Sequence, residues 1–176
     1  MVEYKVFSLL PGFETNTYLV WDTDSKETII IDPSMPSEKL STFIAEKKLY
    51  ILYIINTHGH ADHIGGNSFF SKKYQAPICI HADDKHMLID SKQNLSIYMD
   101  VDLSSPEAGI ILADNQIIEV GKSKLIVLHT PGHTKGSICI LIDHLIFTGD
   151  TLFYRDIGRT DLPGGNENAL KTSIQK

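Results

Sequence analysis

The stretch THGHADHIGG, residues 57–66, decides how the rest of this sequence is interpreted. It directly follows an apolar run, residues 51–56, whose composition predicts a buried strand. The stretch holds three histidines and one aspartate within six positions, namely His58, His60, Asp62 and His63. Residues two apart share one face of a strand, so we expect the first two histidines to point the same way from the strand end. Asp62 and His63 are expected to begin the following helix, so that one pair faces one metal ion and the other pair faces another.

These side chains form a donor set that favours a catalytic metal site. Imidazole nitrogens and a carboxylate oxygen suit zinc, iron or manganese. The stretch lacks the cysteine pairs of a closed structural zinc site, which indicates an open site. The alternative is chance clustering of eight histidines among 176 residues.

Two later motifs argue against chance. His133 lies in TPGHTKGS, where a Pro-Gly pair bends the chain away from a strand that ends at His129. Asp150 lies in TGDTLF, at the end of another apolar strand. In both motifs an apolar strand is followed at once by one metal-ligand type of residue, and strand ends of this kind converge at one edge of a sheet.

The remaining pattern predicts a mixed α/β (α+β) chain. Strands are expected at residues 4–10, 17–22, 28–32, 51–56, 76–81, 116–120, 124–129, 137–143 and 145–148. Helices are expected at residues 37–48, with Ser37 as the N-cap, at 64–74 and at 166–175. The first three strands should form an antiparallel meander, and the βαβα alternation after them predicts helices packed on a sheet. The polar stretch 90–106 is expected to be a long loop with one short helix.

Composition limits the classes of function. The chain carries 16 basic and 22 acidic residues, a net charge of −6, which argues against nucleic-acid binding through bulk charge. Its 176 residues suggest one domain, 1–176. No apolar run approaches the roughly 20 residues of a membrane span, and no secretory signal is evident, so we expect a cytoplasmic protein without membrane partners. Cys79 and Cys139 lie in apolar runs and are expected to be buried free thiols.

The motifs HGHADH, TPGHTKGS and GDTLF, in this order, resemble the metallo-β-lactamase fold superfamily over residues 16–165. Within it, GDTLFYRDIGRTDLPGG is most similar to the glyoxalase II-like (hydroxyacylglutathione hydrolase-like) hydrolases and their persulfide dioxygenase relatives. The resemblance implies a four-layer αββα metallo-β-lactamase sandwich, with the metal site at one edge between two sheets.

The resemblance also implies roles for individual residues. The first of two divalent metal ions, most simply zinc with iron or manganese as alternatives, would be held by His58, His60 and His133. Asp62 and His63 would hold the second ion, and Asp150 would bridge both, which makes Asp62 and Asp150 the expected catalytic carboxylates. Tyr154, Arg155 and Arg159 follow in the same loop and are expected to contact substrate; a solvated Arg–Asp pair is the plainer alternative for Arg159. Asp32, in IIIDPS, resembles a recurring aspartate that either supports the metal loop or caps a turn.

One departure from the family pattern concerns the second metal ion. The family takes a further histidine from a late Gly-His-Gly-like segment, and this sequence has no histidine after Asp150. We expect a C-terminally truncated form of the domain, without its last strand and helix; the alternatives are another group completing the site or a single tightly bound metal ion. His81 and His129 are weaker candidates to replace the missing late histidine. Together with His86 and His144, they are expected to be ordinary structural or surface residues.

The expected activity is hydrolysis of a thioester, such as an acyl-glutathione, by metal-activated water. The alternatives are a persulfide dioxygenase with a single iron on His58, His133 and Asp150, a lactonase of the same fold, and a metal-binding domain without activity. β-Lactam hydrolysis is less favoured because Asp150 stands where the best-known lactamase group has a cysteine. The expected partner is a small-molecule substrate, and the oligomeric state is left open.

Overall fold

Two β-sheets face each other in the computed structural model, which describes residues 1–13 and 15–176. The first sheet has the order β1-β2-β3-β4-β5-β6, and the second has the order β10-β9-β8-β7. The strands of the first sheet are β1 (Val2–Ser8), β2 (Asn16–Asp22), β3 (Glu27–Ile31), β4 (Tyr50–Ile55), β5 (Ile78–His81) and β6 (Ile110–Leu112). Those of the second are β7 (Ile117–Val120), β8 (Ser123–His129), β9 (Ile138–Ile142) and β10 (Leu145–Phe147). A short hairpin, β11 (Leu152–Phe153) with β12 (Asp156–Ile157), follows.

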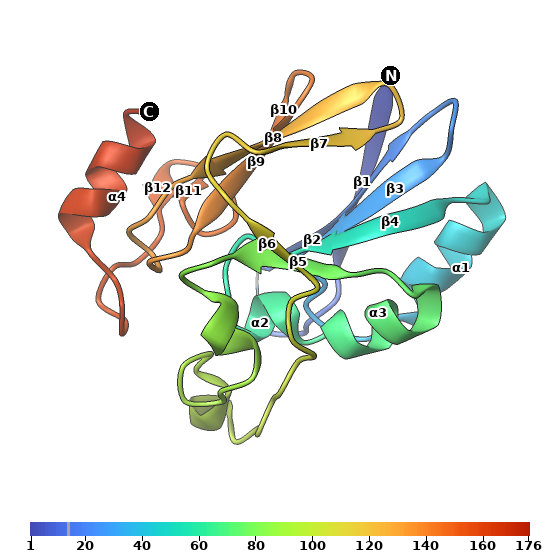
Figure 1. Ribbon diagram of the computed structural model, residues 1–176. Helices are drawn as coiled ribbons and strands as arrows, with labels where there is room; N and C mark the ends of the chain where they lie inside the picture. Colours follow the sequence, from blue (N-terminus) through green and yellow to red (C-terminus); the bar gives the residue numbers. More distant parts are fainter. Residues whose placement is uncertain (14) are drawn as a thin grey trace.

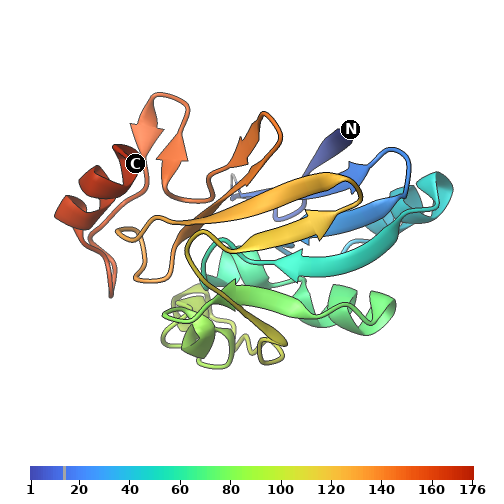
Figure 2. The same ribbon diagram turned by 45° about the horizontal axis from the view of Figure 1, so that its top comes forward.

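The helices of the first half cover the outer face of the first sheet, and the second sheet covers its inner face (Figure 1). They are α1 (Glu38–Lys47), α2 (Ala61–Ile64) and α3 (Asn67–Tyr74). The last helix, α4 (Glu167–Ile174), lies beside the β11–β12 hairpin at one end of the second sheet (Figure 2). None of the helices in the described residues has the length and apolar character needed to cross a membrane.

Strand alternation divides the apolar residues between two cores. On β3, Ile29 and Ile31 face the second sheet, whereas Ile30 faces the helices. The helix-side core includes Leu40 of α1 and Phe70 of α3, both fully buried. Cys79 and Cys139 are buried and free, as predicted.

The predicted antiparallel meander is present as β1-β2-β3, and the later strands β3 to β6 pair in parallel. Ser37 caps α1 as predicted, because its hydroxyl accepts a hydrogen bond from the Leu40 N–H at 3.2 Å. The predicted loop at 90–106 contains one short 3-10 helix, η2 (Ser96–Met99). A preceding 3-10 turn, η1 (Lys85–Leu88), follows β5.

Two predictions of local structure were wrong, and the shortest strands were missed. The single helix expected at 64–74 is broken into α2 and α3 at Gly65-Gly66, where the Gly66 N–H donates to the Pro33 carbonyl instead of to the preceding helical turn; the close approach of residues 33–35 leaves no room for a Cβ at either glycine. The strand expected at 51–56 ends at Ile55, so His58 and His60 lie in the loop beyond it rather than on a strand end. The strands β6, β11 and β12 were not predicted, since two or three residues are too few to show a period.

Helix α4 holds the loop that carries His133. The Asn166 N–H donates to the Gly132 carbonyl at 2.8 Å, and the Ser173 hydroxyl donates to the Pro131 carbonyl at 2.8 Å. Leu170 is fully buried against this loop. The helix therefore fixes the path of residues 131–133.

We predict that Leu170→Ala lowers the free energy of unfolding by about 2–5 kcal/mol, because it leaves a cavity under this loop. Urea unfolding followed by circular dichroism measures the change. Ile174→Ala on the same helix is the matched control: Ile174 is 39% exposed, so its removal should cost far less. Equal losses in the two variants would contradict the role assigned to Leu170.

Candidate metal centre

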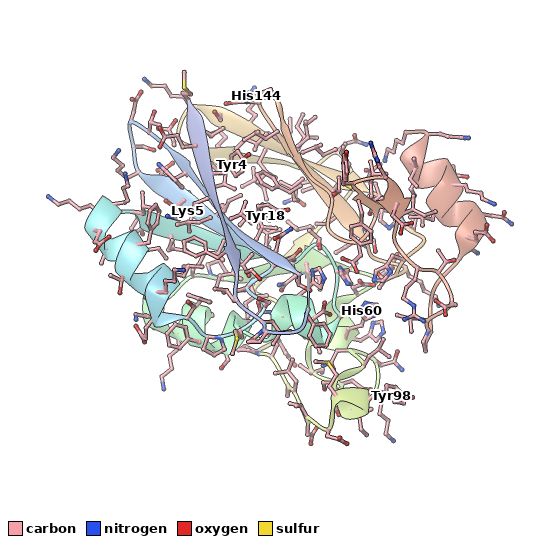
Figure 3. The ribbon with its side chains drawn as sticks, turned by 180° about the vertical axis from the view of Figure 1, so that it is seen from behind. Tyr4, Lys5, Tyr18, His60, Tyr98 and His144 are labelled. Atoms are coloured by element: carbon pink, nitrogen blue, oxygen red, sulfur yellow. The ribbon has the colours of Figure 1, made fainter. Side chains whose placement is uncertain are left out.

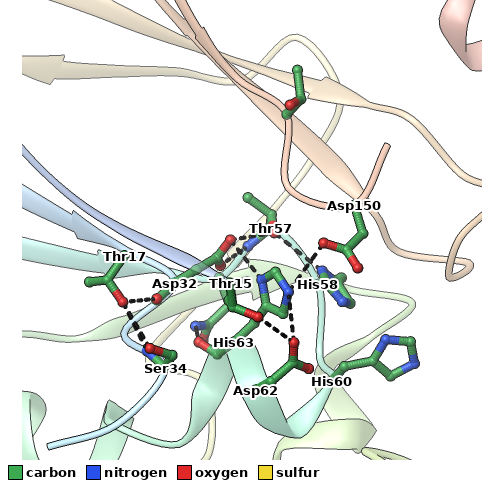
Figure 4. Close-up of polar contacts among 12 residues, drawn as sticks. Thr15, Thr17, Asp32, Ser34, Thr57, His58, His60, Asp62, His63 and Asp150 are labelled. Atoms are coloured by element: carbon green, nitrogen blue, oxygen red, sulfur yellow. Dashed lines mark hydrogen bonds and ion pairs between the residues drawn. The ribbon is translucent and has the colours of Figure 1, made fainter. Parts of the chain in front are cut away.

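Six predicted ligand residues gather where the loops after β4, β8 and β10 meet. Figure 4 labels all of them except His133. They are named the central cluster here and comprise His58, His60, Asp62, His63, His133 and Asp150. His58 and His60 lie in the loop after β4, Asp62 and His63 in α2, His133 in the loop after β8, and Asp150 after β10. Figure 3 shows from behind that His60 lies where the two sheets come together.

Three histidines of the central cluster converge on one point. Ligand atoms of His58, His60 and His133 lie within 4.8 Å of one another, and all three residues are buried. His60 Nδ1 lies 2.9 Å from His133 Nε2. Two ring nitrogens can approach this closely only with a proton or a metal ion between them.

The hydrogen bonds around His58 leave one of its nitrogens bare. The Thr57 hydroxyl donates to Asp32 Oδ2 at 2.6 Å, so at 3.2 Å from His58 Nδ1 the hydroxyl oxygen is the acceptor. The proton of His58 is therefore on Nδ1, and the lone pair is on Nε2. This Nε2 is buried and has no hydrogen-bond partner among the described residues.

The same reasoning applies to His133. Its Nδ1 lies 2.8 Å from the carbonyl oxygen of Arg159, which can only accept, so Nδ1 carries the proton and Nε2 has the free lone pair. A metal-binding histidine typically donates its other N–H to a carbonyl or carboxylate in this way. The donor set thus fits a divalent cation, and His58, His60 and His133 are the residues that would hold it.

A second group surrounds His63. Its Nδ1 lies 3.0 Å from Asp32 Oδ2, and its Nε2 lies 3.2 Å from Asp150 Oδ1 and 3.4 Å from Asp62 Oδ2. Ligand atoms of His58, His63 and Asp150 lie within 4.8 Å of one another. Asp150 Oδ2 is also 3.5 Å from His133 Nε2, so its carboxylate lies between the two groups of histidines, where a bridging ligand would have to be.

Within the central cluster, the positive charge lies on His63. Burial alone lowers the pKa of this imidazole, but the carboxylates of Asp32 and Asp62 raise it well above its ordinary value. Burial raises the pKa of Asp150, yet the hydrogen bond and charge of His63 bring the net pKa below the usual range. A proton on His63 thus supplies the positive charge that a metal ion would supply among these carboxylates.

The three-histidine group behaves in the opposite way. Burial, followed by the charge of His63, lowers the pKa of His58 well below its ordinary value. Burial, followed by the charge of His133, lowers the pKa of His60 to about 3. Both imidazoles are therefore neutral at physiological pH, the state in which they bind metals.

Asp32 supports the metal loop rather than merely capping a turn. It is 1% exposed and has a left-handed backbone with φ 49°, a strained conformation for a residue other than glycine. Its carboxylate accepts the Thr57 N–H at 2.7 Å and the Thr57 hydroxyl at 2.6 Å, and it contacts His63. On the other side of Thr57, Gly149 leaves no room for a Cβ, which brings the Asp150 loop against the same threonine.

Asp84, a residue that the sequence analysis did not identify, links the loop after β4 to the loop after β8 through hydrogen bonds. It is 1% exposed and accepts the Gly59 N–H at 3.2 Å, the Gly136 N–H at 2.8 Å and the Thr134 hydroxyl at 2.6 Å. Gly59 separates His58 from His60, and Thr134 follows His133. An aspartate in a polar loop gives no periodic signal, so only the three-dimensional contacts reveal this role.

The predicted substrate residues lie at different places in the loop after Asp150. Tyr154 lines a pocket of about 700 Å³ that also contains Asp62, His63 and Asp150. The Arg155 guanidinium lies 5.0 Å from the centre of the Tyr154 ring. The Arg159 side chain instead pairs with Asp161, in two hydrogen bonds of 2.7 Å, so this arginine matches the alternative of a solvated Arg–Asp pair.

His81 and His129 do not complete the central cluster but stack on each other elsewhere.

Two facing sheets with a His/Asp cluster between their loops are the arrangement found in proteins of the metallo-β-lactamase fold. The model of the metallo-beta-lactamase superfamily matches residues 10–176, and the chain belongs to this superfamily, whose members are generally hydrolytic enzymes. The expectation of a metallo-β-lactamase fold is thereby confirmed.

Named proteins show the range of this similarity. The chain is 34% identical to "Probable metallo-hydrolase YqgX" of Bacillus subtilis, over 93% of this chain and 78% of that protein. It is 32% identical to "Hydroxyacylglutathione hydrolase GloC" of Haemophilus influenzae, over 93% and 79%. The crystal structure of the B3 metallo-beta-lactamase BLEG-1 superposes with a TM-score of 0.91 at 32% identity, covering 99% of this chain and 84% of that one.

We predict that Asp84→Asn lowers metal affinity by about 10–100-fold, because an amide nitrogen would face an N–H donor that the carboxylate now satisfies. Competition with a chromophoric chelator measures the affinity. Asp90→Asn, at an exposed aspartate near the same loop, is the control and should leave affinity unchanged.

Thr134 provides a second comparison for the same role. Thr134→Ser keeps the hydroxyl that donates to Asp84 and should keep the affinity, whereas Thr134→Val should lower it. Unchanged affinity in both Asp84→Asn and Thr134→Val would show that Asp84 does not hold the ligand loops.

Proposed function

We propose that this chain is a metal-dependent hydrolase that cleaves a thioester of the acyl-glutathione type. The observation that carries the proposal is the convergence of three buried histidines, His58, His60 and His133, next to Asp150, which lines a pocket together with Asp62 and His63. The similarity to a protein named hydroxyacylglutathione hydrolase supports the choice of substrate class.

Divalent cations in such a site would acidify a water molecule and polarise the substrate carbonyl, and zinc is the ion we propose, with iron or manganese as alternatives. The chain itself supplies the groups that orient the reactants. The side chains of Asp62 and Asp150 are 22% and 27% exposed, so they reach the pocket while their other contacts keep them fixed. Each can accept a proton from water and align its oxygen with the carbonyl carbon.

The reaction balances without a nucleophile from the chain. The water oxygen bonds to the carbonyl carbon, the carbon–sulfur bond breaks, and the leaving thiolate takes up a proton from the water. The products are a carboxylic acid and a thiol. Asp32 acts on this step through His63 and Thr57, as a positioning residue that holds the orientation of the metal loop.

The pocket walls suit an acyl group next to the central cluster. Phe13, Tyr18, Leu152, Phe153 and Tyr154 contribute apolar or aromatic surface. No lysine or arginine is among the lining residues in the described part of the chain. The charged part of a glutathione conjugate would therefore extend past Tyr154 toward the rim, where Arg155 lies against that ring.

We predict that the chain, saturated with zinc, hydrolyses S-lactoylglutathione, and that Asp150→Asn lowers the rate by about two orders of magnitude or more by removing a proton acceptor. Release of glutathione, detected with a thiol reagent, measures the rate. Asp161→Asn, at an exposed carboxylate outside the pocket, is the control. A zinc-saturated chain without turnover of this thioester would contradict the proposal.

Two other activities are tested with the same zinc- or iron-loaded chain in separate assays. The structural similarity to a B3 metallo-beta-lactamase favours β-lactam hydrolysis as the second candidate, and a chromogenic cephalosporin reports it. Uptake of dioxygen with glutathione persulfide, by a chain containing one iron, would indicate the dioxygenase alternative. Elemental analysis should accompany both assays, because it gives the identity of the metal and the number of ions per chain.

The two arginines give a prediction about binding. Arg155→Ala is expected to raise KM for S-lactoylglutathione several-fold with little effect on kcat, because a cation at the rim contributes binding rather than chemistry. Arg159→Ala is the matched comparison and is expected to change KM less, since its guanidinium is paired with Asp161. A larger effect of Arg159→Ala on KM would assign substrate binding to Arg159 instead.

A further inference from the structure

A second group of metal-ligand side chains lies outside the central cluster, at the ends of strands from both sheets. His81 is the last residue of β5 in the first sheet, and His129 is the last residue of β8 in the second. Their rings stack with centroids 4.0 Å apart and planes 11° apart. Asp83 follows in the turn after β5, and its carboxylate Oδ2 is 3.8 Å from His81 Nδ1. These three residues are named the edge cluster.

The hydrogen bonds of His129 leave a lone pair for a cation. Its Nε2 lies 2.9 Å from the carbonyl oxygen of Lys135, so Nε2 carries the proton and Nδ1 is bare. His133 in the central cluster has the same arrangement: one ring N–H donates to a backbone carbonyl, and the other ring nitrogen keeps its lone pair. Asp114 fixes the backbone under the ring by accepting the His129 N–H at 2.7 Å.

His81 and Asp83 present acceptors to each other. The Asp83 N–H lies 3.3 Å from His81 Nδ1, so this nitrogen accepts and has no proton. The Asp83 carboxylate nearby is 55% exposed and receives no hydrogen bond from the described residues at the distances that define one. Burial and the neighbouring His129 lower the pKa of His81, which keeps the imidazole neutral. A cation between His81 Nδ1 and the Asp83 carboxylate would replace the long 3.3 Å contact from the Asp83 N–H and give both acceptors a partner.

We propose that His81, Asp83 and His129 form a second metal site, which binds one borderline divalent cation such as zinc, nickel or copper. Ligand atoms of the three residues already lie within 4.8 Å of one another. Two imidazole nitrogens with one carboxylate oxygen select these ions over magnesium and calcium, which prefer oxygen ligands alone. Water would complete the coordination, since the cluster is partly exposed.

The geometry also sets how strongly the edge cluster binds. A metal ion lies in the plane of each imidazole that holds it, so the two stacked rings must tilt apart on binding. The central cluster needs no such change, because its rings already meet edge to face at 86–89°. The edge cluster is therefore the weaker site and fills after the central one.

Occupation of the edge cluster would join the two sheets beside the central cluster. Asp83 precedes Asp84, which ties the two ligand loops, and His129 begins the segment that leads to His133. The bound ion would thus restrain both loops from outside. This proposal does not depend on which substrate the central cluster acts on.

The test counts metal ions bound to the full chain. After the tight sites are saturated with zinc, further zinc titrated in a calorimeter should reveal one additional, weaker equivalent. His81→Gln and His129→Gln should each abolish it and leave the tight equivalents unchanged, and Asp83→Asn should weaken it by about 10–100-fold, as loss of a metal-site partner does. His144→Gln is the control, because His144 is exposed and belongs to neither cluster of ligand residues.

A second measurement covers the case in which a histidine variant does not fold. Nickel added in substoichiometric amounts to the zinc-saturated wild-type chain should broaden the ring signals of His81 and His129 in nuclear magnetic resonance spectra before those of His86 and His144. An additional zinc equivalent that persists in both histidine variants would overturn the proposal. So would the absence of that equivalent, or broadening of the exposed histidines first.

Discussion

Buried imidazole nitrogens that find no hydrogen-bond partner among residues 1–13 and 15–176 are the constraint on which the rest of the structure depends. His58 Nε2 is enclosed by protein, and an unsatisfied buried polar atom costs about 1–3 kcal/mol. His133 Nε2 lies 2.9 Å from His60 Nδ1, and the Nδ1–H of His133 is already used by the Arg159 carbonyl. A cation held by this donor set would satisfy these lone pairs, which makes such an arrangement tolerable in a folded chain.

The fold keeps these nitrogens together by anchoring their loops rather than the rings themselves. Asp32 holds the loop after β4 through Thr57, and Asp84 ties that loop to the one after β8. Helix α4 fixes the other side of the His133 loop through Gly132 and Pro131. Each anchor is a buried hydrogen bond or a packed side chain, and the carboxylates of Asp62 and Asp150 stay partly exposed at the pocket wall.

The central cluster and the edge cluster contain the same types of ligand, but they differ in how far their side chains are already arranged for binding a metal ion. Both combine imidazole with carboxylate, and both contain a histidine whose second nitrogen donates to a backbone carbonyl. The central cluster is buried, and its rings already meet edge to face, whereas the edge cluster is partly exposed and its rings are stacked. Preorganisation therefore separates a site suited to catalysis from one suited to reversible occupation.

The sequence by itself determined the class of fold and the candidate ligands. Apolar runs, each followed directly by a histidine or an aspartate, are local patterns, and the strand period and the Ser37 cap are local as well. Three features were not predicted: the break between α2 and α3, the short strands, and the loop position of His58. They depend on contacts with residues 33–35 or on pairing partners far along the chain. The roles of Asp84 and Arg159 depend on contacts to distant loops, as does the meeting of His81 with His129 across two sheets. Only the tertiary structure decided these features, since hydrogen bonds between loops leave no periodic trace in a sequence.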